Sequence, residues 1–213
     1  MNALVINDNE YQVPTDVSIS KWMEAAKVAG NPDSYISVLI DCPVEEVGLV
    51  PEETKALVMA FLIQTMFPSG AFARGIGVEF DSLSFGEFVD MEVYLDRGID
   101  NHMDDAAAII VKDFNPDMTM SQVWPVYKTY LNWRKALYYN YRNLFGSVDD
   151  DLSEEQQTNP SADAATMWFE IVMAVAQGDI TRMDEITDMP TIRVLNWLAW
   201  NKQKQMELIK AQK

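Results

Sequence analysis

Apolar and polar residues recur over the first 67 residues in a pattern that predicts a small α+β unit. Residues 3–6 and 11–13 are rich in β-branched and aromatic side chains, and the Asn-Asp-Asn between them is typical of a turn. Residues 3–14 therefore predict a hairpin. Apolar residues then recur at the spacing of one helical face, which predicts a helix over residues 18–29.

Two more elements complete this unit. Residues 34–40 (SYISVLI) predict a strand with alternating burial. Pro51 followed by two glutamates is typical of a first helical turn, so a helix is expected over residues 51–67. The order ββαβ favours a ubiquitin-like or ferredoxin-like unit over residues 1–67, and the alternative is a plain α+β cap on a helical body.

The remainder of the chain predicts a helical domain over residues 80–213. Residues 68–80, rich in glycine and proline, form the connection to it. Residues 147–162 (SVDDDLSEEQQTNPSA) are acidic with almost no apolar side chain, which indicates a linker. The predicted fold class is therefore α+β and mostly helical, a small N-terminal unit followed by a helical bundle. The expected helices begin near Ser84, Asp100, Thr119 or Ser121, Ala164, Asp179 and Pro190.

Charge separates the C-terminal end from the rest of the chain. The chain has 33 acidic and 16 basic residues, a net charge of −17. Residues 190–213 have five basic residues against Glu207, a net charge of +4, and residues 1–189 therefore carry −21. This excess of acidic residues opposes binding to nucleic acid and to anionic membranes, because the first contact with either is with negatively charged phosphates. It favours basic partners.

Other features of the composition exclude further classes of protein. A single cysteine, Cys42, excludes an intramolecular disulfide and a multi-cysteine metal site. The N-terminus lacks the basic and apolar regions of a secretory signal. The longest apolar stretch, residues 56–67, is shorter than the roughly 20 residues that span a bilayer. We therefore expect a soluble protein of a virion or of the host cytoplasm.

The final helix has an apolar stripe and two tryptophans within one turn. Two interpretations remain open: the helix packs on its own acidic body, or it docks into the groove of a partner. The part from residue 201 onward is the one expected to project from the body. The residues predicted to bind a partner are Trp197, Trp200, Lys202, Lys204 and Lys210.

Residues 124–145 form the densest aromatic stretch, with basic residues between the rings. Such a pattern can stack single-stranded bases, but the acidic body argues against nucleic acid. The spacing favours core positions, and tyrosine and tryptophan also suit a protein interface. Trp133 and Tyr138 are therefore added to the residues predicted to contact a partner.

Candidate chemistry is sparse. His102 lies among acidic residues and could belong to a metal-dependent hydrolase, but a zinc or iron site normally recruits a second histidine or a cysteine. Asp100 as a helix cap and Asp104 as a first-turn acid explain the cluster by helix electrostatics. The residues around Cys42 do not match the motifs of catalytic cysteines, and we expect Cys42 to be a small buried residue. We expect no catalytic residue, no metal and no cofactor.

Several segments resemble tail and baseplate assembly proteins of contractile-tailed, myovirus-type bacteriophages. They are residues 82–95 (SLSFGEFVDMEVYL), Trp133-Arg134, residues 141–145 (YRNLF), the lysine- and glutamine-rich final helix, and residues 5–27 (VINDNEYQVPTDVSISKWMEAAK). The resemblance covers most of the chain and includes no catalytic or ligand-binding motif. It implies a virion tail component or a chaperone of tail or baseplate assembly.

The resemblance and the charge pattern together predict a non-enzymatic tail or baseplate protein. Its partners would be other virion or tail-assembly proteins, and the oligomeric state stays open. The alternative is an acidic cytoplasmic regulator or assembly chaperone that masks a basic or hydrophobic partner surface. A third hypothesis, a hydrolase that uses His102, belongs to a different class and would require loss of function on substitution of that residue.

Overall fold

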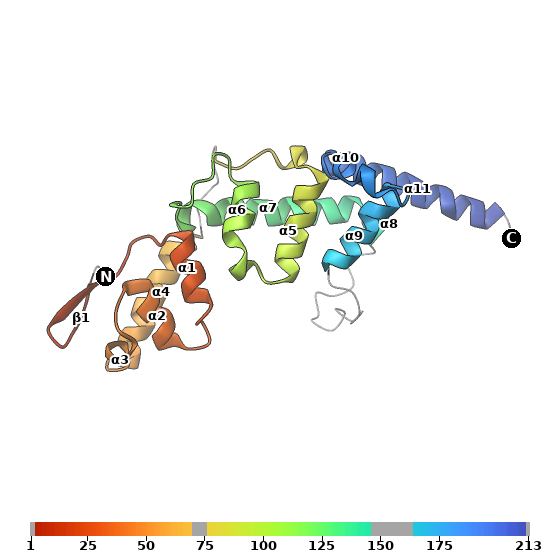
Figure 1. Cartoon of the computed structure of the whole chain (residues 1–213). Coiled ribbons are helices and arrows are strands. Elements are labelled where there is room, and N and C mark those ends of the chain that lie inside the picture. The colour runs from red at the N-terminus through yellow and green to blue at the C-terminus, as the bar shows by residue number, and fades with distance from the viewer. Residues whose placement is uncertain (1–2, 70–75, 146–163, 212–213) are drawn as a thin grey trace. The chain divides into compact units, whose positions relative to one another are not determined.

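The computed structural model describes residues 3–69, 76–145 and 164–211, and Figure 1 shows that these ranges are mostly helical. The chain divides into two compact units. Unit 1 is Met1–Val78 with Gly98–Thr129, and unit 2 is Glu79–Arg97 with Tyr130–Lys213. The sequence predicted domains over residues 1–67 and 80–213 and therefore placed residues 98–129 in the second domain. In the structure these residues belong to unit 1. The predicted linker, residues 147–162, lies outside the described residues.

The predicted N-terminal hairpin is confirmed. Strand β1 (Ala3–Ile6) pairs antiparallel with β2 (Asn9–Gln12), with Ala3 opposite Gln12. The two turn residues, Asn7 and Asp8, have φ values of 48° and 65°. Asparagine and aspartate tolerate this left-handed region better than other residues with a side chain, which is why this turn closes here.

The strand predicted over residues 34–40 is a helix, α2 (Pro32–Ile40). Asn31 caps it, since its side-chain oxygen accepts hydrogen bonds from the backbone amides of Asp33 and Ser34, and Pro32 fits the first helical turn. Its buried residues, Ile36, Leu39 and Ile40, have helical spacing. The elements described between residues 3 and 67 therefore run ββαααα, and the ubiquitin-like ββαβ unit is not confirmed.

Unit 1 joins these elements to a later part of the chain. The carboxylate of Asp16 accepts hydrogen bonds from the hydroxyls of Thr119 (2.7 Å) and Ser121 (2.5 Å). The backbone amide of Met120 donates to the carbonyl of Val17 at 2.8 Å. These bonds tie the start of α7 to the start of α1 and explain why residues 98–129 belong to unit 1. Its helices are α1 (Ile19–Ala26), α2, α3 (Val44–Val47), α4 (Glu52–Met66), η2 (Ile99–Asn101), α6 (Met103–Ile110) and the first part of α7 (Met120–Asn140).

Unit 2 forms around one apolar core. The helix expected to begin near Ser84 is α5, and Ser84 and Glu87 form a capping box at its start: the amide of Glu87 donates to the Ser84 hydroxyl and the amide of Ser84 donates to the Glu87 carboxylate. The largest buried side chains of its core are Phe85, Phe88 and Trp168. Its helices are η1 (Phe80–Ser82), α5 (Phe85–Asp96), the second part of α7, α8 (Arg142–Phe145), α9 (Ala164–Val175), η3 (Ile180–Arg182), α10 (Met183–Thr187) and α11 (Thr191–Ala211).

Candidate functional site

The candidate site is built around α11, whose first turn is fixed to the start of α5. The backbone amide and the hydroxyl of Thr191 both donate to the carbonyl of Leu83, each at 2.9 Å, and the hydroxyl also lies 3.0 Å from the carbonyl of Ser84. The amide of Phe85 donates to the carbonyl of Met189 at 2.7 Å. Thr191 is fully buried, so these bonds are shielded from water. They position α11 relative to the core of unit 2.

The first half of α11 is an anchor. Val194 and Leu195 are buried in the same core cluster as Trp168, and Ile192 and Leu198 pack against that cluster while remaining partly buried. The apolar stripe predicted from the sequence therefore packs, in this half, on the chain's own unit 2. Packing of an amphipathic face, more than intrinsic propensity, stabilises a helix in this setting.

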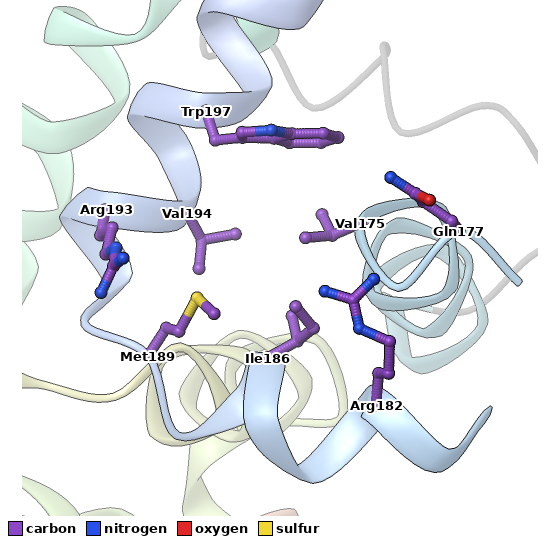
Figure 2. Close-up of a pocket in the computed structure, with 8 residues that line it drawn as sticks. All are labelled: Val175, Gln177, Arg182, Ile186, Met189, Arg193, Val194 and Trp197. Carbon is purple, nitrogen blue, oxygen red and sulfur yellow. The ribbon is translucent and has the colours of Figure 1, made fainter. Parts of the chain in front are cut away.

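A pocket of about 200 Å³ lies beside this anchor. It is lined by Val175, Gln177, Arg182, Ile186, Met189, Arg193, Val194 and Trp197. Figure 2 shows the indole of Trp197 on one side of the pocket, Ile186 and Met189 on the opposite side, and the two arginines toward its edges. The floor is apolar and the edges are cationic. Such a pocket suits an apolar side chain that has a carboxylate nearby.

The second half of α11 is exposed. Every described residue from 202 to 211 is exposed, and Leu208 keeps 64% of its surface and Ile209 57%. Lys204 forms an ion pair with Glu207 at 3.0 Å, and this hydrogen bond lowers the pKa of Glu207. Lys202 donates to the carbonyl of Leu144 at 3.4 Å. This half therefore presents apolar side chains among lysines to solvent.

Trp197 and Trp200 lie at the transition between the two halves. Trp197 is 37% exposed and forms a wall of the pocket, whereas Trp200 is 57% exposed. Five of the residues predicted to bind a partner (Trp197, Trp200, Lys202, Lys204 and Lys210) thus lie together along α11. We call these five residues, together with the exposed apolar Met206, Leu208 and Ile209, the α11 surface.

The other two predicted residues, Trp133 and Tyr138, are held within unit 2. The indole NH of Trp133 donates to Asp81 at 2.8 Å, and its ring meets that of Phe88 with centroids 6.3 Å apart. The ring of Tyr138 packs against that of Phe145 with centroids 4.3 Å apart. Both side chains are half-buried, so their aromatic surface is largely used by the fold itself.

Tyr138 also belongs to a buried polar network. Arg134 donates two hydrogen bonds to the carboxylate of Glu92, at 2.5 and 2.7 Å, and the hydroxyl of Tyr138 donates to the same carboxylate at 2.7 Å. Burial and the Glu92 charge raise the pKa of Tyr138. Burial alone would lower the pKa of Arg134, but its hydrogen bonds to Glu92 outweigh this and raise it. The carboxylate of Glu92 on α5 thus accepts three hydrogen bonds from side chains of α7, and these bonds hold α7 against α5.

The remaining candidates from the sequence lie in unit 1. Cys42 is buried, and burial raises the pKa of its thiol. Nδ1 of His102 lies 3.7 Å from a carboxylate oxygen of Asp105, at the start of α6. Within the described ranges, no three histidine, cysteine, aspartate or glutamate side chains are arranged to hold a metal ion. None of the helices described is both long and apolar enough to cross a membrane.

Sequence reasoning did not identify the pocket beside α11 or the buried carboxylate of Glu92. The pocket gathers residues from α9, α10 and α11, and no local spacing indicates that three helices meet there. Glu92 was recognisable as an acidic residue on the apolar side of its helix, which is a signal for a buried ion pair. No family model matches the chain, and comparisons with curated proteins and with solved structures find no match.

Proposed function

We propose that this chain is a non-enzymatic structural or assembly protein of a phage tail or baseplate, which binds other proteins through the α11 surface. One observation carries the proposal: residues 202–211 continue a helix that is anchored in unit 2, yet all of them are exposed, including the apolar Met206, Leu208 and Ile209. Apolar side chains gathered on an exposed helix mark a surface that a partner covers.

The charge of this surface indicates the chemistry of the partner. Lys202, Lys204 and Lys210 outnumber Glu207, so the exposed half of α11 is cationic, and Arg182 and Arg193 add positive charge at the pocket. Complementary charge steers association and fixes orientation. The partner surface is therefore expected to be acidic with apolar side chains. The resemblance to tail and baseplate proteins supplies the setting, and the partners would be other virion or tail-assembly proteins.

A second candidate is an acidic cytoplasmic regulator or assembly chaperone. The net charge of −21 over residues 1–189 favours it, because such a body can cover a basic surface on a protein that awaits assembly. The two candidates differ in where the chain ends up. A structural component stays in the assembled particle, and a chaperone is released from it.

Removal of residues 202–213 tests the proposal. We expect the truncated chain to keep the melting temperature of the full chain and to lose only the helical circular dichroism signal of the removed residues, because the described residues of this segment are helical and exposed. We expect it to lose co-purification with virion or tail-assembly proteins when it replaces the full chain in the cells that produce it. A variant with Lys204→Glu and Lys210→Glu should show the same loss, and Lys204→Arg with Lys210→Arg should not.

Three results would contradict parts of this proposal. A truncated chain that unfolds would make the exposed segment a structural clasp. Unchanged co-purification would remove the α11 surface as the binding element. A full chain that occurs free in the cytoplasm and never in particles would favour the chaperone over the structural component.

A further inference from the structure

Helix α4 of unit 1 has an apolar face without a partner among the described residues. Between Lys55 and Phe67 the helix carries no charged residue, and apolar side chains occupy all of its faces. Val58, Leu62 and Met66 are buried. A helix that is apolar all round is normally buried on all sides.

The outer face of α4 is nevertheless exposed. Leu57 keeps 64% of its surface and Ile63 47%, and the neighbouring Ala56 and Ala60 are also exposed. Beside Ile63 lies a pocket of about 440 Å³, whose lining is almost entirely apolar: Ala29, Pro32, Tyr35, Met59, Ile63 and Phe67. We call Ala56, Leu57, Ala60, Ile63 and this pocket the α4 face. It is large enough to receive several apolar side chains of another helix.

The charge around the α4 face is negative. Unit 1 has 15 acidic and 6 basic residues, a net charge of −9. Glu52 and Glu53 occupy the first turn of α4 and are exposed. Lys55 of the same helix is already paired with Asp33 at 2.8 Å and with Glu52 at 2.9 Å. The α4 face therefore has the character expected above for the partner of the α11 surface: apolar side chains beside carboxylates.

We propose that the α11 surface of one copy of this chain docks on the α4 face of a second copy, so that the chain assembles head to tail. This inference rests on the proposed function, since it uses the same docking helix, and it names a partner for it. Met206 and Ile209, which lie three residues apart on one side of α11, would cover Leu57 and Ile63. The exposed segments also match in length, since residues 202–211 and 56–66 each extend about 15 Å as helix.

Charge selects this arrangement over symmetric ones. A pair of two α11 surfaces would bring lysines against lysines, and a pair of two α4 faces would bring two units of net charge −9 together. Like charges in contact oppose both pairings, whereas α11 on α4 brings opposite charges together. A contact between two different surfaces of the same chain continues from copy to copy and produces a ring or an open filament.

The test uses the full chain and two variants whose substitutions lie on exposed positions. The first variant, Ile209→Asp, breaks the α11 surface, and the second, Leu57→Asp with Ile63→Asp, breaks the α4 face. Circular dichroism and melting temperature show whether each variant is folded. Ile209→Leu is the matched control for the first variant, and Leu57→Met with Ile63→Val for the second. Mass is measured by analytical ultracentrifugation up to about 1 mM protein at low and at high salt.

Head-to-tail assembly predicts a specific set of masses. The unmodified chain should grow in mass with concentration and shrink with added salt. Each broken variant should associate at least about tenfold more weakly, because a carboxylate enters an apolar contact, while both controls should behave like the unmodified chain. An equal mixture of the two broken variants should form dimers and nothing larger, since one intact α11 surface meets one intact α4 face.

Other outcomes overturn the inference. A chain that stays monomeric at every concentration rules out self-assembly. Dimers that survive in one broken variant alone, with no gain on mixing, identify a symmetric contact. If the chain is monomeric while loss of residues 202–213 still abolishes co-purification with virion proteins, only the second-copy partner is wrong. If co-purification is also unaffected, the proposed function falls as well.

Discussion

The two halves of α11 have the same apolar spacing but different surroundings. In the first half the stripe is buried, with Leu195 fully enclosed in the core of unit 2, and in the second half Ile209 and its neighbours meet solvent. One continuous helix thus carries an anchor and an exposed extension. A regular apolar stripe therefore predicts a contact, but the surface that it contacts can change along a single helix.

The largest expected effect comes from shortening a buried side chain in the first half of α11. Leu195→Ala should lower the free energy of unfolding by about 3 kcal/mol, because it leaves a cavity in a fully buried position. Leu208→Ala, the matched substitution in the exposed half, should change it by less than about 0.5 kcal/mol. Urea unfolding of both variants measures the contrast. Equal losses would mean that the exposed half also packs on its own chain.

A smaller effect is expected at the first turn of α11. Thr191→Val removes the hydroxyl that bonds to the carbonyls of Leu83 and Ser84 in a buried place, and it keeps the shape of the side chain. We expect a loss of about 1 to 2 kcal/mol in the free energy of unfolding. Thr181→Val, which changes an exposed threonine, serves as the comparison. A neutral Thr191→Val would show that apolar packing alone holds the anchor.

The smallest effect is a pH dependence of stability that arises from Tyr138 in unit 2. The pKa of Tyr138 is raised in the folded chain by burial and by Glu92, so the neutral phenol is favoured there. A raised pKa stabilises the fold below the unfolded value of about 10, and this contribution is lost as the pH rises above it. The melting temperature should therefore fall more steeply above pH 10 in the unmodified chain than in Tyr138→Phe.

The exposed half of α11 provides the contrast to this pH dependence. Hydrogen bonds from Lys204 and Gln203 lower the pKa of Glu207, but the pair is exposed to water. Glu207→Gln should leave the melting temperature unchanged between pH 3 and pH 7, an interval that spans the ordinary titration range of glutamate. A clear dependence on Glu207 would place this half of the helix in a buried contact.

Local patterns predicted the start of α5 and the N-terminal turn, but not the cap of α6: Asp100 lies in η2, and His102 precedes α6 without a side-chain cap. Local patterns also failed where a strand and a helix share one pattern. The capping box at Ser84 and the turn at Asn7-Asp8 depend on a few neighbouring residues, so the sequence is sufficient to find them. Residues 34–40 satisfied both strand and helix spacing. The cap from Asn31 and the proline after it favour the helix, because they satisfy its first amides and fit its first turn.

Within the candidate site, the sequence identified α11 as a basic and aromatic helix but could not tell its two halves apart. Trp133 and Tyr138 had the composition of an interface, yet Asp81 and Glu92, 52 and 46 residues away in the chain, engage their polar groups. The two pockets are likewise formed by residues from several helices. Such groupings depend on contacts between distant segments, which no local pattern records.

The helical character of the chain, its N-terminal hairpin and the reversal of charge at its C-terminal end follow from the sequence, because propensity, turn chemistry and charge are properties of the residues themselves. Which apolar stripes are buried depends on the fold. Leu195 and Ile209 lie fourteen residues apart on the same side of one helix, but the core of unit 2 covers only Leu195. Burial depends on the surfaces that the rest of the chain brings against a helix, and that requires the fold.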